Sequence, residues 1–274
     1  MRIPSYWRKA DMPLQTPQGA TWTIEAWGWS DASEEQAAAH ARELLKAQAA
    51  AIAAGRPRER YLYHDRPLRE EILDRCAPGV LITRNRYGAE ILNTEQVAFV
   101  DVDLDLRSGR PGFFARLFGA HDPGPQQAVA DQVEVLRAAL KGIASARVYR
   151  THSGLRLLLT DRLHVPHEPQ TLSMLEALGS DPLYRTLCRE QRCFRARLTP
   201  KPWRVGLRDM PGRWPYADPQ GVEAWVARYR TRCEQLASTR YLETLGDEAE
   251  LAEVRAVVEL HDRLSGAHSG RELA

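Results

Sequence analysis

Three aspartates stand at alternate positions where a wholly apolar run ends. The segment QVAFVDVDLDL carries Asp101, Asp103 and Asp105 directly after the apolar residues 97–100. In a strand these carboxylates share one face, about 6.6 Å apart, while the residues between them face a core. Carboxylates at this spacing can close on one divalent cation, Mg²⁺ or Mn²⁺, which relieves their mutual repulsion. We predict that Asp101 and Asp103 bind metal and that Asp105 is a solvated bystander; a half-buried edge strand with a wet charged face is the alternative.

A second candidate site is the strand-turn-strand pattern VYRTHSGLRLLLTD. Its turn contains Thr151, Ser153 and Gly154, whose backbone N–H groups and hydroxyls suit a phosphate group. Arg150 leads into the turn and Arg156 leaves it, so both could hold the same anion. The alternative is a hairpin in which Gly154 only satisfies a positive φ and the arginines are solvated.

Positive charge is concentrated in one stretch of the chain. Overall, 38 Lys and Arg oppose 36 Asp and Glu, a formal net charge of +2, so no global field demands an acidic partner. Residues 185–213, however, contain eight arginines and one lysine against two acids. The planar fork of arginine matches phosphate oxygens, so Arg197, Lys201 and Arg204 are candidate ligands of a triphosphate or a nucleic-acid backbone. A solvated charged face is the alternative.

A third group of polar residues precedes the aspartates. Arg84, Asn85 and Tyr87 lie at the tip of a predicted hairpin, and these residue types suit recognition of a base or sugar by stacking and hydrogen bonds. The alternative is turn chemistry, in which Asn85 and Gly88 tolerate a left-handed conformation.

Several classes of protein are disfavoured. No Walker A, G-x-G-x-x-G, G-x-S-x-G or H-E-x-x-H pattern occurs, which argues against a P-loop ATPase, an ordinary dinucleotide dehydrogenase and a serine hydrolase. The amino-terminal residues MRIPSYW have no apolar leader, and no stretch approaches about eighteen apolar residues, so we expect no membrane segment. The four cysteines form no C-x-x-C pair, and we expect reduced thiols in a cytoplasmic protein.

Local patterns predict the elements that position these residues. Strands are predicted at 21–29, 61–64, 80–83, 90–93, the segment that ends in the aspartates, 146–151, 155–160, 194–198 and 203–207. Helices are predicted at 33–54, 68–76, 126–142, 170–178 and 183–190, with a helical pattern from 218 to about 264. Residues 107–124, rich in Gly, Pro and Phe, are predicted to form a surface loop.

This mixed order of strands and helices predicts an α+β fold, a mixed sheet with helices packed on it, rather than a parallel Rossmann sheet. We expect an α+β core over residues 1–215, with an N-terminal βαβ part at 20–78 and a metal and phosphate site in 79–215. A helical C-terminal segment, residues 216–274, follows.

The order of the motifs resembles that of the archaeo-eukaryotic primase superfamily, which includes primase-polymerases and the polymerase domains of bacterial end-joining ligases. In that family a hydrophobic strand ending in Asp-x-Asp precedes a helix and a strand-turn-strand of the form Ser-Gly-x-His. Asp101 and Asp103 match the first motif, and the run from Ser153 to Arg156 matches the second, with arginine where the family has histidine. Asp209 is the nearby candidate for the third acid of the family.

The resemblance covers residues 96–209, and it includes the segment RLTPKPWR, which is similar to the basic, proline-containing stretch that often precedes the third motif. It implies an RRM-like, primase-type core that binds Mg²⁺ or Mn²⁺ and a nucleoside triphosphate, DNA or RNA. In this interpretation Asp101, Asp103 and Asp209 are catalytic. Arg156, which replaces the histidine of the family, can bind a triphosphate at least as well.

Three functions are therefore open. The first is metal-dependent nucleotidyl or phosphoryl transfer on nucleotides or nucleic acid. The second is a non-catalytic nucleic-acid-binding protein on the same fold, in which the arginine-rich stretch supplies affinity and the aspartates are structural. The third is a metal-dependent phosphohydrolase or nuclease, because acids and arginines serve cleavage as well as synthesis.

Overall fold

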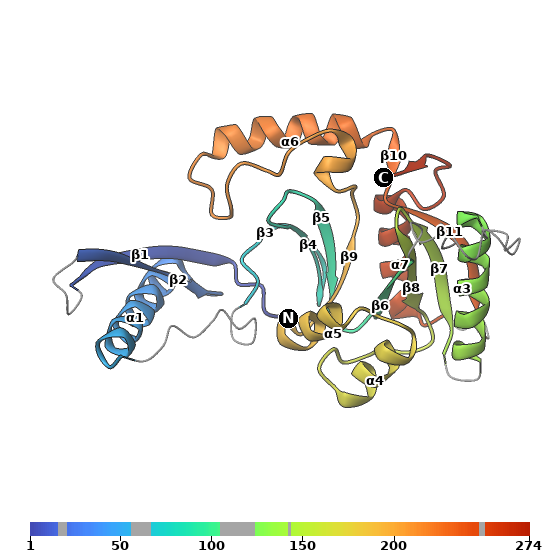
Figure 1. Ribbon diagram of the computed structural model, residues 1–274, viewed down its shortest axis with the longest axis horizontal. Helices are drawn as coiled ribbons and strands as arrows, with labels where there is room; N and C mark the ends of the chain where they lie inside the picture. Colours follow the sequence, from blue (N-terminus) through green and yellow to red (C-terminus); the bar gives the residue numbers. More distant parts are fainter. Residues whose placement is uncertain (16–20, 56–66, 105–123, 142–143, 247–249) are drawn as a thin grey trace, which may run out of the picture.

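Antiparallel sheets with helices packed around them make up the structure, a computed structural model (Figure 1). The predicted α+β class is confirmed. In the part of the chain that is described, strands form two four-stranded sheets, a long hairpin and a short parallel pair. The described residues are 1–15, 21–55, 67–104, 124–141, 144–246 and 250–274.

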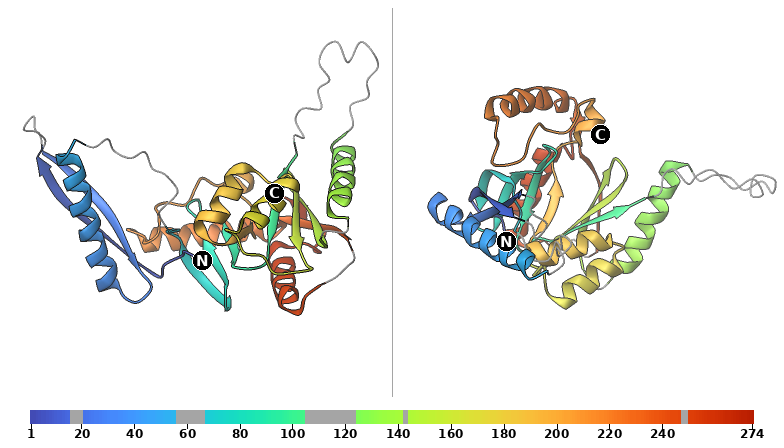
Figure 2. Two further views of the ribbon diagram at one scale, coloured as in Figure 1. Left: turned by 90° about the horizontal axis from the view of Figure 1, so that it is seen from below. Right: turned by 60° about the vertical axis from the view of Figure 1, so that its left-hand side comes forward.

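An N-terminal arm consists of β1 (Tyr6–Gln15), β2 (Thr21–Ser30) and α1 (Glu34–Ala53). The two strands form an antiparallel hairpin that α1 covers, and Figures 1 and 2 show the three elements projecting from the rest of the molecule. The helix packs very close to β2, because a Cβ on Gly28 would stand 2.1 Å from the backbone nitrogen of Ala41. The sequence predicted β2 and α1 but not β1.

The central sheet consists of β3 (Glu71–Ala77), β4 (Val80–Arg84), β5 (Glu90–Thr94) and β9 (Phe194–Arg197), paired in that order. The predicted hairpin of β4 with β5 is confirmed. The helix predicted at 68–76 is wrong, because most of this stretch belongs to strand β3. The register of β3 with β4 shifts twice, and these irregularities remove the two-residue alternation that identifies a strand.

The second sheet carries the aspartates. It has the order β11-β7-β8-β6, with every neighbouring pair antiparallel. Residues 97–100 and Val102 are buried, as the sequence predicted, and Leu104 is partly buried against the same core. Its strands are β6 (Phe99–Asp103), β7 (Ala146–Thr151), β8 (Gly154–Leu159) and β11 (Thr239–Leu245).

Four helices contribute side chains to one core shared by both sheets. The four are α3 (Pro125–Leu140), α4 (Pro169–Ala177), α5 (Pro182–Gln191) and α7 (Ala252–Ser265). Three of them, α3, α4 and α5, confirm predicted helices. In the described part of the chain no helix is long and apolar enough to cross a membrane. The predicted strand at 61–64, Asp105 and the predicted loop before Gly124 lie outside the described residues.

The C-terminal region is not continuously helical. Helix α6 (Pro219–Cys233) is followed by β10 (Leu236–Ala237) and by β11, and β12 (Glu272–Leu273) pairs with β10 in parallel. The predicted helical pattern over 218–264 is therefore wrong between α6 and α7. Strand β11 completes the edge of the second sheet, and a register irregularity in its pairing with β7 breaks the strand alternation.

The strand predicted at 203–207 is also wrong, because this stretch begins as the 3₁₀ turn η2 (Pro202–Val205). Proline lacks an N–H group to donate to a strand ladder, and Pro202 stands at the first position of the turn, where its fixed φ suits helical geometry. The turn ends at Gly206, which has φ +73°.

Side chains join the two sheets where β6 and β9 lie near each other. The Tyr184 hydroxyl, on α5, donates to the carbonyl oxygen of Phe99 at 3.0 Å and accepts from the backbone nitrogen of Arg195 at 3.3 Å. Arg195 also pairs with Glu70 through two contacts of 2.7 and 2.8 Å, and Glu70 accepts from the Thr83 hydroxyl at 2.7 Å. Tyr184 thus links β9, the edge strand of the central sheet, to β6 of the second sheet, and Arg195 links β9 to Glu70.

Breaking the Glu70–Arg195 pair should destabilise the fold. The two side chains are only 8 % and 17 % exposed, so Glu70→Gln leaves a buried guanidinium without its carboxylate. We expect the free energy of unfolding in urea to fall by about 3 kcal/mol. The matched control is Glu25→Gln, which removes one partner of the exposed Lys9–Glu25 pair and should cost about 0–1 kcal/mol. Equal effects of the two substitutions would contradict the anchoring role.

Candidate functional site

A pocket of about 260 Å³ lies where β6, β8 and β9 meet the start of α5 and the turn η2. It brings together predicted site residues from three stretches that are far apart in the sequence. Eight of them line it: Asp101, Asp103, Thr151, Ser153, Arg156, Arg197, Lys201 and Arg204.

The central interaction of the pocket is an ion pair between Arg156 and Asp101, which lie opposite each other on β8 and β6. The guanidinium Nε and Nη2 of Arg156 donate to the two carboxylate oxygens at 2.7 and 3.0 Å, a bidentate contact. Its Nη1 donates to the carbonyl oxygen of Arg197 at 2.9 Å. Arg156 is 2 % exposed, whereas the Asp101 side chain is 40 % exposed and faces the pocket.

The ion pair sets the protonation of Asp101. Burial alone would raise the pKa of this carboxyl group, but the charge and hydrogen bonds of Arg156 outweigh burial. The pKa of Asp101 consequently lies below its ordinary value. The Asp101 carboxylate is therefore ionised, and the guanidinium of Arg156 balances its negative charge.

The donor set does not fit the metal site that the sequence predicted. Both oxygens of Asp101 accept hydrogen bonds from Arg156, and the remaining carboxylates of the pocket, Asp103 and Asp181, are exposed. Within the described ranges, no group of three His, Cys, Asp or Glu side chains is arranged to hold a metal ion. Arg156 supplies the positive charge that Asp101 needs, so the Asp-x-Asp pattern requires no divalent cation here.

Three cations of the pocket have no carboxylate partner among the residues that the structure describes: Arg197, Lys201 and Arg204. The Nε of Arg197 is buried and has no hydrogen-bond partner in the same set of residues. Burial and then the positive charge of Arg197 lower the pKa values of Lys201 and Arg204. The pocket therefore holds mutually repelling positive charges, which an anion would stabilise.

The turn between β7 and β8 lies against these cations. Nη2 of Arg204 donates to the Ser153 hydroxyl at 2.8 Å, and Nη1 of Arg150 donates to the carbonyl oxygen of Gly154 at 2.6 Å. Arg150 thus braces the turn and does not line the pocket. A Cβ on Gly154 would stand 2.1 Å from the carbonyl oxygen of Val102, so glycine is required here for the close approach of β8 to β6.

Two predicted groups lie elsewhere. Asp209 is exposed and outside the pocket, in the loop after η2, so it is not a third acid of this site. Arg84 is 3 % exposed and contacts Glu71 and the carbonyl oxygen of Gly88, while Asn85 accepts from three backbone N–H groups of its own turn. These side chains stabilise their own turn, and Gly88 has φ +104°, but Asn85 does not adopt the left-handed conformation that the alternative included.

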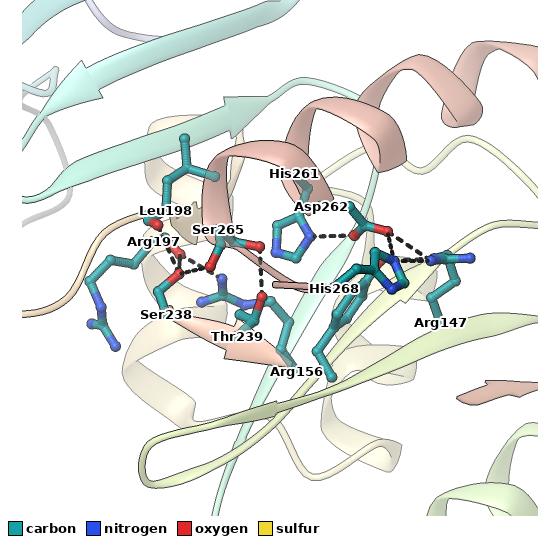
Figure 3. A network of polar contacts seen from close by, with 11 residues as sticks. Arg147, Arg156, Arg197, Leu198, Ser238, Thr239, His261, Asp262, Ser265 and His268 are labelled. Carbon is teal, nitrogen blue, oxygen red and sulfur yellow. Dashed lines mark hydrogen bonds and ion pairs between the residues drawn. The ribbon is translucent and has the colours of Figure 1, made fainter. Parts of the chain in front are cut away.

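A buried polar network extends behind the pocket (Figure 3). The Ser238 hydroxyl donates to the carbonyl oxygen of Leu198 at 2.8 Å, and the Thr239 hydroxyl donates to the hydroxyl oxygen of Ser265 at 2.6 Å. Because Arg156 bonds the neighbouring carbonyl of Arg197, strands β8, β9 and β11 and helix α7 meet in one set of contacts. This network fixes the backbone that carries Arg197.

His261 lies on the side of α7 that faces this network, between the rings of Phe99 and Tyr149. It is fully buried, and burial and the nearby charge of Arg156 lower its pKa, so the ring is neutral. The next residue, Asp262, pairs with Arg147 at 2.7 Å. These side chains support the sheet from behind and do not line the pocket.

Sequence reasoning missed two polar residues of the pocket, Asp181 and Tyr184. Asp181 caps the N-terminus of α5 by accepting from the backbone nitrogen of Tyr184 at 3.0 Å, and both residues line the pocket. The Asp-Pro step at 181–182 is a recognisable helix-start signal, but nothing in the sequence connects it to the aspartates of β6.

Comparison with protein-family models, with curated proteins and with solved structures found no match to this chain. The resemblance to the primase superfamily therefore stays a prediction from the residues that carry it.

Asp101→Asn should destabilise the protein by about 2 kcal/mol, less than for a fully buried pair because Asp101 is partly exposed. The wild-type pair stabilises the fold above the unfolded-state pKa of about 3.9 and loses this contribution as pH falls through the lower folded-state pKa. The stability difference between wild type and Asp101→Asn should therefore shrink in acid. Urea unfolding from neutral to acidic pH measures it.

Asp103→Asn is the matched control. It removes the same charge from the same face of β6, but Asp103 is exposed, so its unfolding free energy should stay within about 0.5 kcal/mol of wild type. If Asp101→Asn is as stable as Asp103→Asn, the ion pair between β6 and β8 does not stabilise the fold.

Proposed function

We propose that this protein binds the phosphate groups of a nucleotide or of a nucleic acid in the pocket between β6, β8 and β9. One observation carries the proposal: Arg156 already neutralises Asp101, and Arg197, Lys201 and Arg204 remain as cations without carboxylate partners among the described residues. An anion with several oxygens is the ligand that such a group of cations stabilises best.

The chemistry of each side chain supports this role. The guanidinium of Arg204 and the ammonium of Lys201 supply charge, and the hydroxyls of Thr151 and Ser153 line the same pocket as further hydrogen-bond donors. The carboxylates of Asp103 and Asp181 limit how closely an anion approaches the open side. The cations outnumber these two free carboxylates, so the pocket keeps a net positive charge.

The position of the ion pair favours binding over metal-dependent transfer. Asp101 stands where the primase superfamily has a metal ligand, and Arg156 stands where that family has histidine. In this chain the two residues pair with each other. The order of strand, helix and hairpin, β6-α3-β7-β8, supports a primase-type, RRM-like core. The Asp101–Arg156 ion pair supports a non-catalytic protein on that core, which binds phosphate groups through its arginines.

The first test is binding of a fluorescein-labelled oligothymidylate over a range of NaCl concentrations, measured by fluorescence anisotropy. Affinity should fall with salt, and Lys201→Gln and Arg204→Gln should each reduce the slope of log K against log salt by about 0.7. The control Arg228→Gln, which removes an exposed arginine of α6 outside the pocket, should leave affinity and slope unchanged.

The same titration in EDTA and in Mg²⁺ or Mn²⁺ separates the competing functions. We expect equal affinity in all three conditions. Binding that requires Mg²⁺ or Mn²⁺ and is lost in Asp103→Asn would reject the proposal and favour metal-dependent transfer or hydrolysis. The reaction products would then distinguish a polymerase from a phosphohydrolase or nuclease.

His152 reports independently on the charge of the pocket. Burial and then four neighbouring cations lower its pKa, these being Arg204, Arg150, Arg197 and Lys201. A bound polyanion offsets that positive charge, so saturating inorganic tripolyphosphate should raise the pKa of His152. Proton NMR titration of the histidine signals, with His152→Gln to assign the resonance, measures the change. An unchanged pKa at saturation would place the anion elsewhere.

A further inference from the structure

The large aromatic side chain of Trp203 is exposed to solvent next to residues that line the pocket. Trp203 is 52 % exposed, on the turn η2, whose neighbouring residues Pro202 and Val205 are buried. Lys201 and Arg204, on either side of it in the sequence, line the pocket. The turn therefore holds Trp203 at the rim of the pocket and leaves about half of its surface to solvent.

The exposed ring is supported from two directions. The ring of Tyr87 meets Trp203 edge-on, with 5.4 Å between centroids and 62° between planes, and the Lys201 ammonium stands 5.2 Å from the centre of the Trp203 ring. A tryptophan ring with a cation and an aromatic edge against it is held in one orientation. These two contacts restrict the rotation of the exposed Trp203 ring.

The turn that carries Tyr87 is itself rigid. The side-chain oxygen of Asn85 accepts from the backbone N–H groups of Tyr87, Gly88 and Ala89 at 3.0 to 3.2 Å. A Cβ on Gly88 would stand 2.3 Å from the Trp225 ring of α6, so this turn is packed tightly against that helix. Tyr87 is thereby preorganised beside Trp203 before any ligand arrives.

We propose that Trp203, braced by Tyr87, is a stacking platform for a base of single-stranded nucleic acid whose adjoining phosphate occupies the pocket. This inference rests on the proposed function and names its ligand. Every base has a π-face, so stacking on tryptophan adds affinity with little dependence on sequence, and cations beside the aromatic ring track the backbone. A base inside a duplex is covered on both faces and cannot use the platform.

Two further exposed arginines belong to the turn of Tyr87 and to the loop that contacts this turn. The exposed Arg86 precedes Tyr87, and the exposed Arg208 belongs to the loop whose Met210 nitrogen donates to the Tyr87 carbonyl oxygen at 3.2 Å. Exposed arginines therefore occur on the turn of Tyr87 and on the loop that contacts it, in addition to the cations of the pocket. A strand has phosphates on both sides of each base, whereas a free nucleotide has them on one side only.

The experiment compares two fluorescein-labelled oligomers of about 12 nucleotides, oligothymidylate and an abasic strand of the same length. Wild type, Trp203→Ala and Trp203→Phe are titrated with each, and anisotropy is recorded. The matched control is Trp22→Ala, which removes a tryptophan that is 56 % exposed on the N-terminal arm. Thermal unfolding checks that the variants are folded.

We expect Trp203→Ala to weaken binding of oligothymidylate by about 5- to 150-fold and to leave binding of the abasic strand unchanged. Trp203→Phe should keep most of the affinity, and Trp22→Ala all of it. Unchanged oligothymidylate binding by Trp203→Ala, or an equal loss for both strands, would reject the platform while the phosphate site stands. If wild type binds neither strand, the platform is rejected, and the titration of His152 with tripolyphosphate decides whether the phosphate site stands.

Discussion

A fully buried guanidinium is the constraint on which this structure depends. Burying Arg156 is costly unless its charge is balanced and its donors are paired. Among the residues that the structure describes, Asp101 on β6 balances the charge and accepts two hydrogen bonds, and the backbone carbonyl of Arg197 on β9 accepts a third. One side chain of β8 thus ties the edge of the second sheet to the edge of the central sheet. The relative position of the two sheets, and with it the pocket between them, follows from this contact.

The same ion pair determines the electrostatics of the pocket. Because Asp101 is neutralised from within, it is not free to balance the cations on the opposite wall, and Arg197, Lys201 and Arg204 repel one another. A fold that had only to be stable would offer these cations carboxylate partners. Their lack of such partners among the described residues is the physical reason to expect an anionic ligand.

Stability and binding are arranged on separate sides of the same strands. The buried hydroxyls of Ser238 and Thr239 hydrogen-bond to Leu198 and Ser265 and hold the backbone of β9 and β11 against α7, and the neutral ring of His261 packs against Phe99 and Tyr149. On the side of the pocket, the turn η2 carries Lys201 and Trp203, and the β4-β5 turn carries Tyr87, which contacts the Trp203 ring. Rigid support of exposed groups reduces the entropy lost on binding.

The sequence by itself determined the local features. The apolar run before Asp101, the hairpin of β7 with β8 and the helices α1 and α3 to α5 each follow from a pattern within a few residues, so each could be predicted. Strands β3 and β11 could not, because register irregularities break their alternation and only pairing with a neighbour makes them strands. The chemistry of Asp101 was decided by tertiary structure alone. Its spacing from Asp103 indicates a metal ligand. Arg156, 55 positions later, lies opposite Asp101 and donates hydrogen bonds to both of its carboxylate oxygens. A carboxylate responds to the nearest charge in space, and the sequence specifies neighbours only along the chain.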